Sequence, residues 1–314
     1  MPQQPPAPEA PEAELDRLRT EVLAQVKAAD PRLAEVVRAA VTHLHAFVRE
    51  VRPTEEEWLA GLDFLVRTGH ACTATRNEFI LLSDMLGLTS AVDEVNHAGP
   101  AEATPSSVEG PFHSPAPPRP LGAWIAEGPE RERGRPMAVH GRVTDCAGRP
   151  LAGATVDVWQ ADDAGRYDTQ DAAQPPGNLR ALLTTAEDGS YWFRSVLPSS
   201  YPVPTDGPVG DLLTALGRHP MRPAHIHLRV AAPGHRPVTT HVFVAGDPYL
   251  DSDAAFAVKD ALVVTPEAVD DPAAAERWSL SAPFLDFAFD VRLVARPDGT
   301  EDAAAKTGAA EVAR

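Results

Sequence analysis

The chain of 314 residues is long enough for one large domain, or for a compact domain with a smaller one attached. Its 45 acidic and 28 basic residues give a formal net charge of −17, which argues against nucleic acid or an anionic membrane surface as a partner because like charges repel. No apolar run reaches the length of about 18 residues that a membrane span needs, so membrane insertion is not expected. Two cysteines are too few for a disulfide framework, and without a secretory signal at the N-terminus they indicate a cytoplasmic protein.

Composition and periodicity change along the chain and predict four segments. Residues 1–13 are rich in proline, alanine and glutamate, and residues 297–314 are rich in alanine and charge. Both are expected to be disordered tails, because they can bury little apolar surface. Between them we expect a helical and linker domain over residues 14–110 and a β-rich domain over residues 111–296.

The helical segment is identified by apolar residues that recur every three or four positions, as in Leu15, Leu18, Val22 and Val26. Thr54 followed by Glu57 predicts a capping box at the start of a helix that Gly69 ends. A further helix is expected to include residues 77–86.

From Met137 onward the apolar period becomes two and turn dipeptides recur, which is typical of an antiparallel β-sandwich or barrel. The candidate strands are residues 137–144, 154–160, 180–185, 190–195, 224–231, 238–245 and 284–294. Residues 197–222 are rich in proline and glycine and too irregular to be a strand, and a loop of that length in a compact domain is usually functional. The predicted fold class is therefore α+β, with an antiparallel β-sandwich catalytic domain after an N-terminal α-helical domain.

His225 and His227 are separated by one residue on a predicted strand. Because successive side chains alternate on a strand, both project from one face and can bind one metal ion. Imidazole is a ligand for zinc, copper, iron and nickel, so the pair does not choose the metal. Two histidines on a half-buried strand without a metal are the alternative in a chain with eleven histidines.

Tyr167 and Tyr201 lie among turn residues, where an aromatic side chain has no evident packing reason. Packing against a turn explains either tyrosine taken alone. As a metal ligand, each would have to lose a proton whose ordinary pKa is about 10, and only a strongly acidic cation favours that near neutral pH. Ferric iron meets this requirement better than zinc, because it prefers hard anionic oxygen.

Four segments together resemble the intradiol ring-cleavage dioxygenases: VEGPFH, GRVTDCAGRPLAGATVDVWQADDAGRYD, PSSYPVP and RPAHIHLRVAAPGH. The resemblance covers roughly residues 30–295 and is closest to the hydroxyquinol and catechol 1,2-dioxygenases. It implies one Fe(III) per chain, held by Tyr167, Tyr201, His225 and His227. Tyr201 would dissociate when substrate binds, and Arg222 would be catalytic beside the ring. A structural ion pair is the alternative role for Arg222.

The segment FVAGDPYLDSDAAFAVKD resembles the hydroxyquinol enzymes more than the plain catechol enzymes. This implies cleavage of benzene-1,2,4-triol by O₂ between the two ortho hydroxyl carbons, giving 3-hydroxy-cis,cis-muconate or maleylacetate. Catechol or chlorocatechol is the alternative substrate. His241 stands where the catechol enzymes have glutamine, and Glu109 is a charge where related enzymes often carry an apolar residue.

By the same resemblance, a set of residues should line the ring pocket, namely Leu81, Asp84, Val108, Gly110, Pro111, Phe112, Pro202, Val203, Arg222 and Ala255. Asp84 could accept a hydrogen bond from a third ring hydroxyl, which would discriminate against a diol that lacks it. A local cap or pairing near the end of its helix is the alternative for Asp84.

The resemblance also implies a homodimer formed through the N-terminal helices, with a phospholipid as a candidate ligand at the dimer interface. Two other classes of function are the alternatives. A non-enzymatic, prealbumin-like binding module would explain the segment GRVTDCAGRPLAGATVDVW, but neither Tyr201 nor the histidine pair. A zinc hydrolase could use His225 and His227 with a carboxylate, but no HExxH motif supports it.

Overall fold

The computed structural model describes residues 11–73 and 76–296, in two compact units that meet between Arg67 and Thr68. This division lies earlier than the predicted change of domain after residue 110, because the helices of residues 78–97 belong to the second unit. The tails predicted at 1–13 and 297–314 fall almost entirely outside the described residues, apart from residues 11–13, which begin the first helix.

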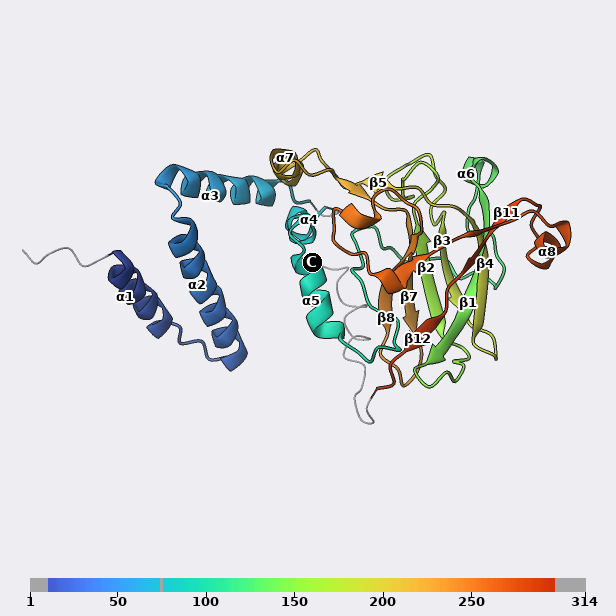
Figure 1. Ribbon diagram of the computed structural model, residues 1–314, viewed down its shortest axis with the longest axis horizontal. Coiled ribbons are helices and arrows are strands. Elements are labelled where there is room, and N and C mark those ends of the chain that lie inside the picture. The colour runs from blue at the N-terminus through green and yellow to red at the C-terminus, as the bar shows by residue number, and fades with distance from the viewer. Residues whose placement is uncertain (1–10, 74–75, 297–314) are drawn as a thin grey trace, which may run out of the picture. The chain divides into compact units, whose positions relative to one another are not determined.

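The first unit is helical, as the sequence predicts (Figure 1). Its helices are α1 (Pro11–Ala24), α2 (Pro31–Val51) and most of α3 (Glu55–His70), whose end from Thr68 onward belongs to the second unit. The capping box is confirmed: Thr54 Oγ1 accepts from the Glu57 N–H at 3.2 Å, and Glu57 Oε2 accepts from the Thr54 N–H at 2.8 Å. The helix continues through Gly69 and ends at His70, so the predicted stop was one residue early.

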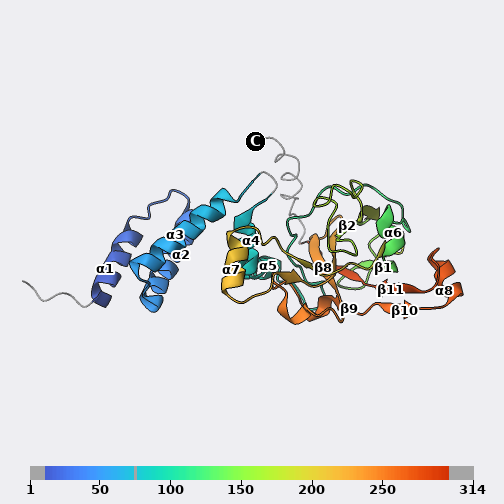
Figure 2. The same ribbon diagram turned by 90° about the horizontal axis from the view of Figure 1, so that it is seen from above.

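The helices of the second unit are α4 (Glu78–Met85), α5 (Leu88–His97), α6 (Pro129–Arg133), α7 (Pro208–Ala215) and α8 (Pro272–Arg277). The Asn77 side chain caps α4 by accepting from the N–H groups of Phe79 and Ile80, both at 3.1 Å. Helices α4 and α7 lie side by side (Figure 2), and Glu78 ties them together by accepting from the Val209 N–H at 3.2 Å.

The strands are β1 (Pro136–Asp145), β2 (Thr155–Gln160), β3 (Arg180–Thr184), β4 (Ser190–Val196), β5 (Tyr201–Pro202), β6 (Met221–Arg222), β7 (His225–Ala231), β8 (Val238–Val244), β9 (Val263–Val264), β10 (Glu267–Val269), β11 (Phe284–Ala288) and β12 (Val291–Leu293). One five-stranded sheet has the order β3-β2-β7-β8-β9, and the other has the order β10-β11-β1-β12 with β4 also paired to β1. The predicted α+β class is confirmed. Most neighbouring strands are antiparallel, but β1 pairs in parallel with β11 and β12, and β8 with β9.

Alternate residues of both sheets point inward and form one apolar core, as Val139 and Phe193 do from one sheet and Val158 and Leu228 from the other. All four are almost fully buried. Within the described residues, every helix falls short of the length or the apolar character that a membrane span needs.

Two expected segments differ from the prediction. The predicted strand 284–294 is two strands, β11 and β12, which pair in parallel with β1 in one register. The pairing is interrupted at residues 289 and 290, where the Phe289 carbonyl group lies against Gly141. Residues 197–222 contain the helix α7 and two strands of two residues, β5 and β6, in which Tyr201 pairs with Arg222. Strands of two residues are too short to show a period in the sequence.

The close approach of the Phe289 carbonyl group to Gly141 leads to a prediction about stability. A methyl group at this position would overlap the Phe289 carbonyl oxygen, which also accepts from the Tyr191 hydroxyl at 2.6 Å. Gly141→Ala should therefore lower the free energy of unfolding by about 1–3 kcal/mol or more in denaturant titrations. As the matched control, Gly61→Ala in α3 meets no atom and should be neutral or stabilising by up to about 1 kcal/mol. Equal stabilities of the two variants would contradict the packing account.

Candidate metal centre and substrate pocket

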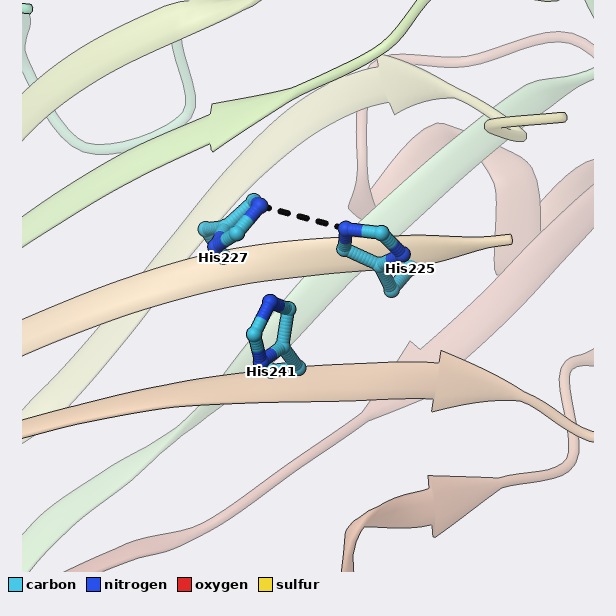
Figure 3. A group of neighbouring side chains, drawn as sticks. All are labelled: His225, His227 and His241. Atoms are coloured by element: carbon cyan, nitrogen blue, oxygen red, sulfur yellow. Dashed lines mark hydrogen bonds between the residues drawn. The ribbon is translucent and has the colours of Figure 1, made fainter. Parts of the chain in front are cut away.

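His225 and His227 lie on β7, in the middle of the first sheet, and their rings project from the same face (Figure 3). Their Nε2 atoms are 3.1 Å apart, and each residue is 1% exposed. The alternation expected from the sequence therefore places both imidazoles at one point inside the domain.

The two tyrosines reach the same point from different segments. Tyr201 lies on β5, and Tyr167 lies in the loop after β2; both are buried. The Tyr167 hydroxyl oxygen is 3.3 Å from the Tyr201 hydroxyl oxygen and 3.5 Å from His225 Nε2. Gly165 allows this approach, because it has φ of +77° and a Cβ there would lie 2.7 Å from the Tyr201 Cβ. Two oxygens and two nitrogens thus converge from distant parts of the chain.

Burial sets the protonation state of these four groups. It raises the pKa of Tyr167 well above its usual value, with a further contribution from Tyr201, and it raises the pKa of Tyr201. Burial, together with the Arg222 charge, lowers the pKa of His225 to about 3 and that of His227 well below its usual range. Both imidazoles are therefore neutral and free to bind a metal, whereas the phenols give up their protons only to a strongly acidic cation. This donor set fits ferric iron.

Arg222 is buried on β6, and the pairing of β5 with β6 places it directly opposite Tyr201. Its Nε and Nη2 donate to the two carboxylate oxygens of Asp253 at 3.1 and 3.2 Å, and its Nη1 lies 3.5 Å from His241 Nε2. Asp253 also accepts from the N–H groups of Ala255 and Ala257. Burial alone would lower the pKa of Arg222, but the Asp253 carboxylate raises it, so the guanidinium stays charged. Arg222 forms the ion pair that was the alternative, and it also faces the pocket.

A cavity of ≈ 180 Å³ adjoins Tyr201 and Arg222, and this volume is sufficient for one aromatic ring. Most of the residues expected from the resemblance line it, namely Leu81, Asp84, Val108, Gly110, Pro111, Phe112, Val203, Arg222 and Ala255. Pro202 does not line the cavity and is exposed, because its neighbours Tyr201 and Val203 point inward and side chains alternate along the strand.

Sequence reasoning missed several residues of the pocket wall, namely Arg76, Asn77, Glu78, Ile80, Met85 and Pro204. Helical spacing in the sequence could have identified some of these residues. Asn77, Ile80 and Met85 share one face of α4 with Leu81 and Asp84, at the spacing of three and four residues that a helix produces.

Asp84 is buried in the pocket wall, and among the described residues its Oδ1 has no hydrogen-bond partner. Burial raises the pKa of the Asp84 carboxyl group, whereas a side-chain hydrogen bond with Thr89 and the nearby Arg222 charge oppose this shift, so Asp84 also has the local partner that was its alternative role. A buried acceptor without a partner is unusual in a folded protein. Asp84 lines the cavity as a residue, although Oδ1 itself is covered by protein atoms.

The structure shows the contacts of Glu109 and His241, the two residues for which the sequence offered no explanation. Glu109 points away from the cavity that its neighbours Val108 and Gly110 line, and lies 3.9 Å from Arg229. His241, on β8, is the third imidazole of Figure 3, and one of its ring nitrogens lies within 4.8 Å of a ring nitrogen of His225 and of His227. Its Nδ1 is 2.8 Å from Ser107 Oγ, so its ring is held between Ser107 and Arg222.

Comparisons with known proteins agree with this geometry. Residues 108–295 match the family model described as "Dioxygenase", and residues 30–104 match "Catechol dioxygenase N terminus". The chain is 46% identical to a hydroxyquinol 1,2-dioxygenase from Rhizobium sp. (strain MTP-10005), covering 82% of this chain and 89% of the relative. It is 42% identical to a catechol 1,2-dioxygenase from Candida albicans, covering 77% and 80%.

A solved structure extends the similarity to the fold. The hydroxyquinol 1,2-dioxygenase from Pseudomonas putida DLL-E4 superposes with a TM-score of 0.85 at 41% identity, covering 91% of this chain and 100% of that one. Family models, sequence relatives and structure all point the same way, so this chain belongs to the intradiol ring-cleavage dioxygenase family.

Proposed function

We propose that this protein is a ferric intradiol dioxygenase that cleaves hydroxyquinol, benzene-1,2,4-triol, between its two ortho hydroxyl carbons with O₂. The product would be 3-hydroxy-cis,cis-muconate, which tautomerises to maleylacetate. One observation carries the proposal: two phenol oxygens and two imidazole nitrogens converge beside a cavity that can hold one ring. Enzymes of this family use iron. Tyr167, Tyr201, His225 and His227 would hold one Fe(III) per chain.

The two tyrosines would play different parts. When bound, Fe(III) supplies a Lewis acid that draws electron density from a chelated diolate. Tyr201 lines the cavity, whereas Tyr167 does not. Tyr201 is therefore placed to yield its position to the substrate and to accept a proton from a substrate hydroxyl, while Tyr167 remains in place.

Arg222 would stabilise negative charge that develops on the substrate during cleavage. It lines the cavity and carries a charge at all relevant pH values, and Asp253 holds its guanidinium in place through two hydrogen bonds. A fixed, buried cation needs no reorganisation when the charge develops, which is the condition for electrostatic stabilisation of a transition state.

Asp84 would select the triol. Its carboxyl group belongs to the wall of a mostly apolar cavity, where a third ring hydroxyl would donate to it. A plain diol would leave this acceptor without a partner, which costs binding free energy. This is the reason to prefer hydroxyquinol over catechol or chlorocatechol as the substrate.

The N-terminal helices are proposed as a homodimerisation surface. On α2, large apolar side chains are exposed to solvent, among them Leu33, Leu44 and Phe47. Exposed apolar surface of this kind commonly marks a protein interface. A phospholipid at that interface and a cytoplasmic location remain predictions from the sequence.

Colour and iron content test the ligand set. The purified protein should be red-brown from tyrosinate-to-iron charge transfer, with about one iron per chain. Tyr201→Phe should shift and weaken this absorption band, because one of the two phenolates is lost. Tyr191→Phe is the matched control, since Tyr191 is buried elsewhere and donates to the Phe289 carbonyl. A spectrum unchanged by Tyr201→Phe would remove Tyr201 from the ligand set.

Proton release on metal binding provides an independent measurement. Because burial raises the pKa of both phenols, they are protonated in the metal-free protein at neutral pH and must lose their protons to Fe(III). Affinity for iron should therefore increase as pH rises. Calorimetry in buffers of different ionisation enthalpy should find one proton fewer released per iron in Tyr201→Phe than in the wild type. Equal proton release would contradict coordination through the Tyr201 oxygen.

Asp84→Leu tests the substrate assignment. Loss of the buried acceptor should lower kcat/KM for benzene-1,2,4-triol by about 10–100-fold, the effect expected for one hydrogen bond to a charged group. Catechol, which lacks the third hydroxyl, is the internal control and should be affected much less. Oxygen uptake with both substrates measures the ratio. If the wild type preferred catechol, or if both substrates lost rate equally, the hydroxyquinol assignment would be wrong.

A further inference from the structure

The two imidazoles of the candidate metal centre are held in different ways. His225 Nδ1 lies 2.7 Å from the Pro223 carbonyl oxygen, to which it donates, so this bond fixes the ring and leaves Nε2 free for a metal. His227 has no such bond: among the described residues, its buried Nδ1 has no hydrogen-bond partner. Histidine ligands almost always donate their second N–H to an acceptor that orients the ring. The orientation of His227 therefore needs another cause.

The register of the sheet supplies that cause. In the order β2-β7-β8, Trp159 is the direct partner of His227 on one side, and His241 is its direct partner on the other. The Trp159 and His227 rings are nearly parallel, at 11°, with their centroids 4.6 Å apart. The His241 ring lies 4.1 Å from that of His227 at 49°. Three rings from adjacent strands thus form a row with the candidate ligand at its centre.

The indole in this row is itself held firmly. Trp159 is fully buried, and the His113 ring contacts it edge to face at 4.6 Å. His113 Nε2 lies 2.9 Å from a carboxylate oxygen of Asp157, which is on the same strand as Trp159. A fixed indole can orient a neighbouring imidazole, because rotation of the imidazole would separate the two stacked faces.

We propose that Trp159 is a positioning residue for the metal centre, which orients His227 by ring stacking in place of the missing hydrogen bond. The inference rests on the proposed ferric site. It predicts that Trp159 governs how long the protein retains iron, although the indole itself contacts neither metal nor substrate.

The chain offers a close control for this role. Trp278, at the end of α8, stacks on His140 with ring centroids 4.6 Å apart at 21°, and His140 belongs to the other sheet. Replacing Trp278 removes the same kind of ring pair from a site that has no proposed part in metal binding. A general effect of losing a buried tryptophan would appear in both variants.

The experiment follows iron loss from the loaded, full-length protein to an excess of a ferric chelator, by the decay of the tyrosinate-to-iron band, with folding checked by circular dichroism. Trp159→Leu should lose iron about tenfold faster than the wild type, the scale on which outer contacts of metal ligands act. Trp159→Phe, which keeps a smaller ring, should lie between them. Trp278→Leu should match the wild type.

The measured rates of iron loss either support or overturn the proposal that Trp159 orients His227. Iron loss from Trp159→Leu at the wild-type rate, or equally fast loss from Trp278→Leu, overturns the inference. So does a Trp159→Phe rate equal to that of Trp159→Leu, since stacking would then have no part. If Trp159→Leu does not fold, Trp159→Phe is compared with Trp278→Phe, and equal rates overturn it. A wild-type protein that takes up no iron would instead refute the proposed function.

Discussion

The convergence of two buried phenols and two buried imidazoles is the constraint on which the rest of the site depends. Burial keeps Tyr167 and Tyr201 protonated and His225 and His227 neutral, so the four groups carry no charge of their own. Only a cation acidic enough to displace phenolic protons uses all four donors. The protonation states imposed by burial therefore narrow the choice of metal more than the histidine pair can.

Short pieces of regular structure place the other groups around this point. The two-residue pairing of β5 with β6 sets Tyr201 opposite Arg222, so one candidate metal ligand lies directly across from the proposed catalytic arginine. The facing wall of the pocket comes from α4, which Glu78 fastens to α7. The cavity is thus closed by segments more than a hundred residues apart, and the helix α4 belongs as much to the site as the sheet does.

The predictable part of this site was local in sequence. Alternation along a strand places His225 and His227 on one face, and helical spacing is enough to group Asn77 and Leu81 with Asp84. Cross-strand neighbours were not predictable, because the register between strands depends on the whole sheet. Trp159 and His241 flank His227 only through that register. The break between β11 and β12 likewise occurs where Phe289 lies against Gly141, a contact between distant residues that no local pattern indicates.

A folded protein normally pairs its buried polar groups, and this site departs from that rule where a ligand is expected. Asp84 Oδ1, in the wall of the pocket, and His227 Nδ1, beside the candidate metal centre, are buried without a hydrogen-bond partner among the described residues. The fold tolerates these unpaired groups because the surrounding structure holds their side chains in place, as the rings of Trp159 and His241 hold His227.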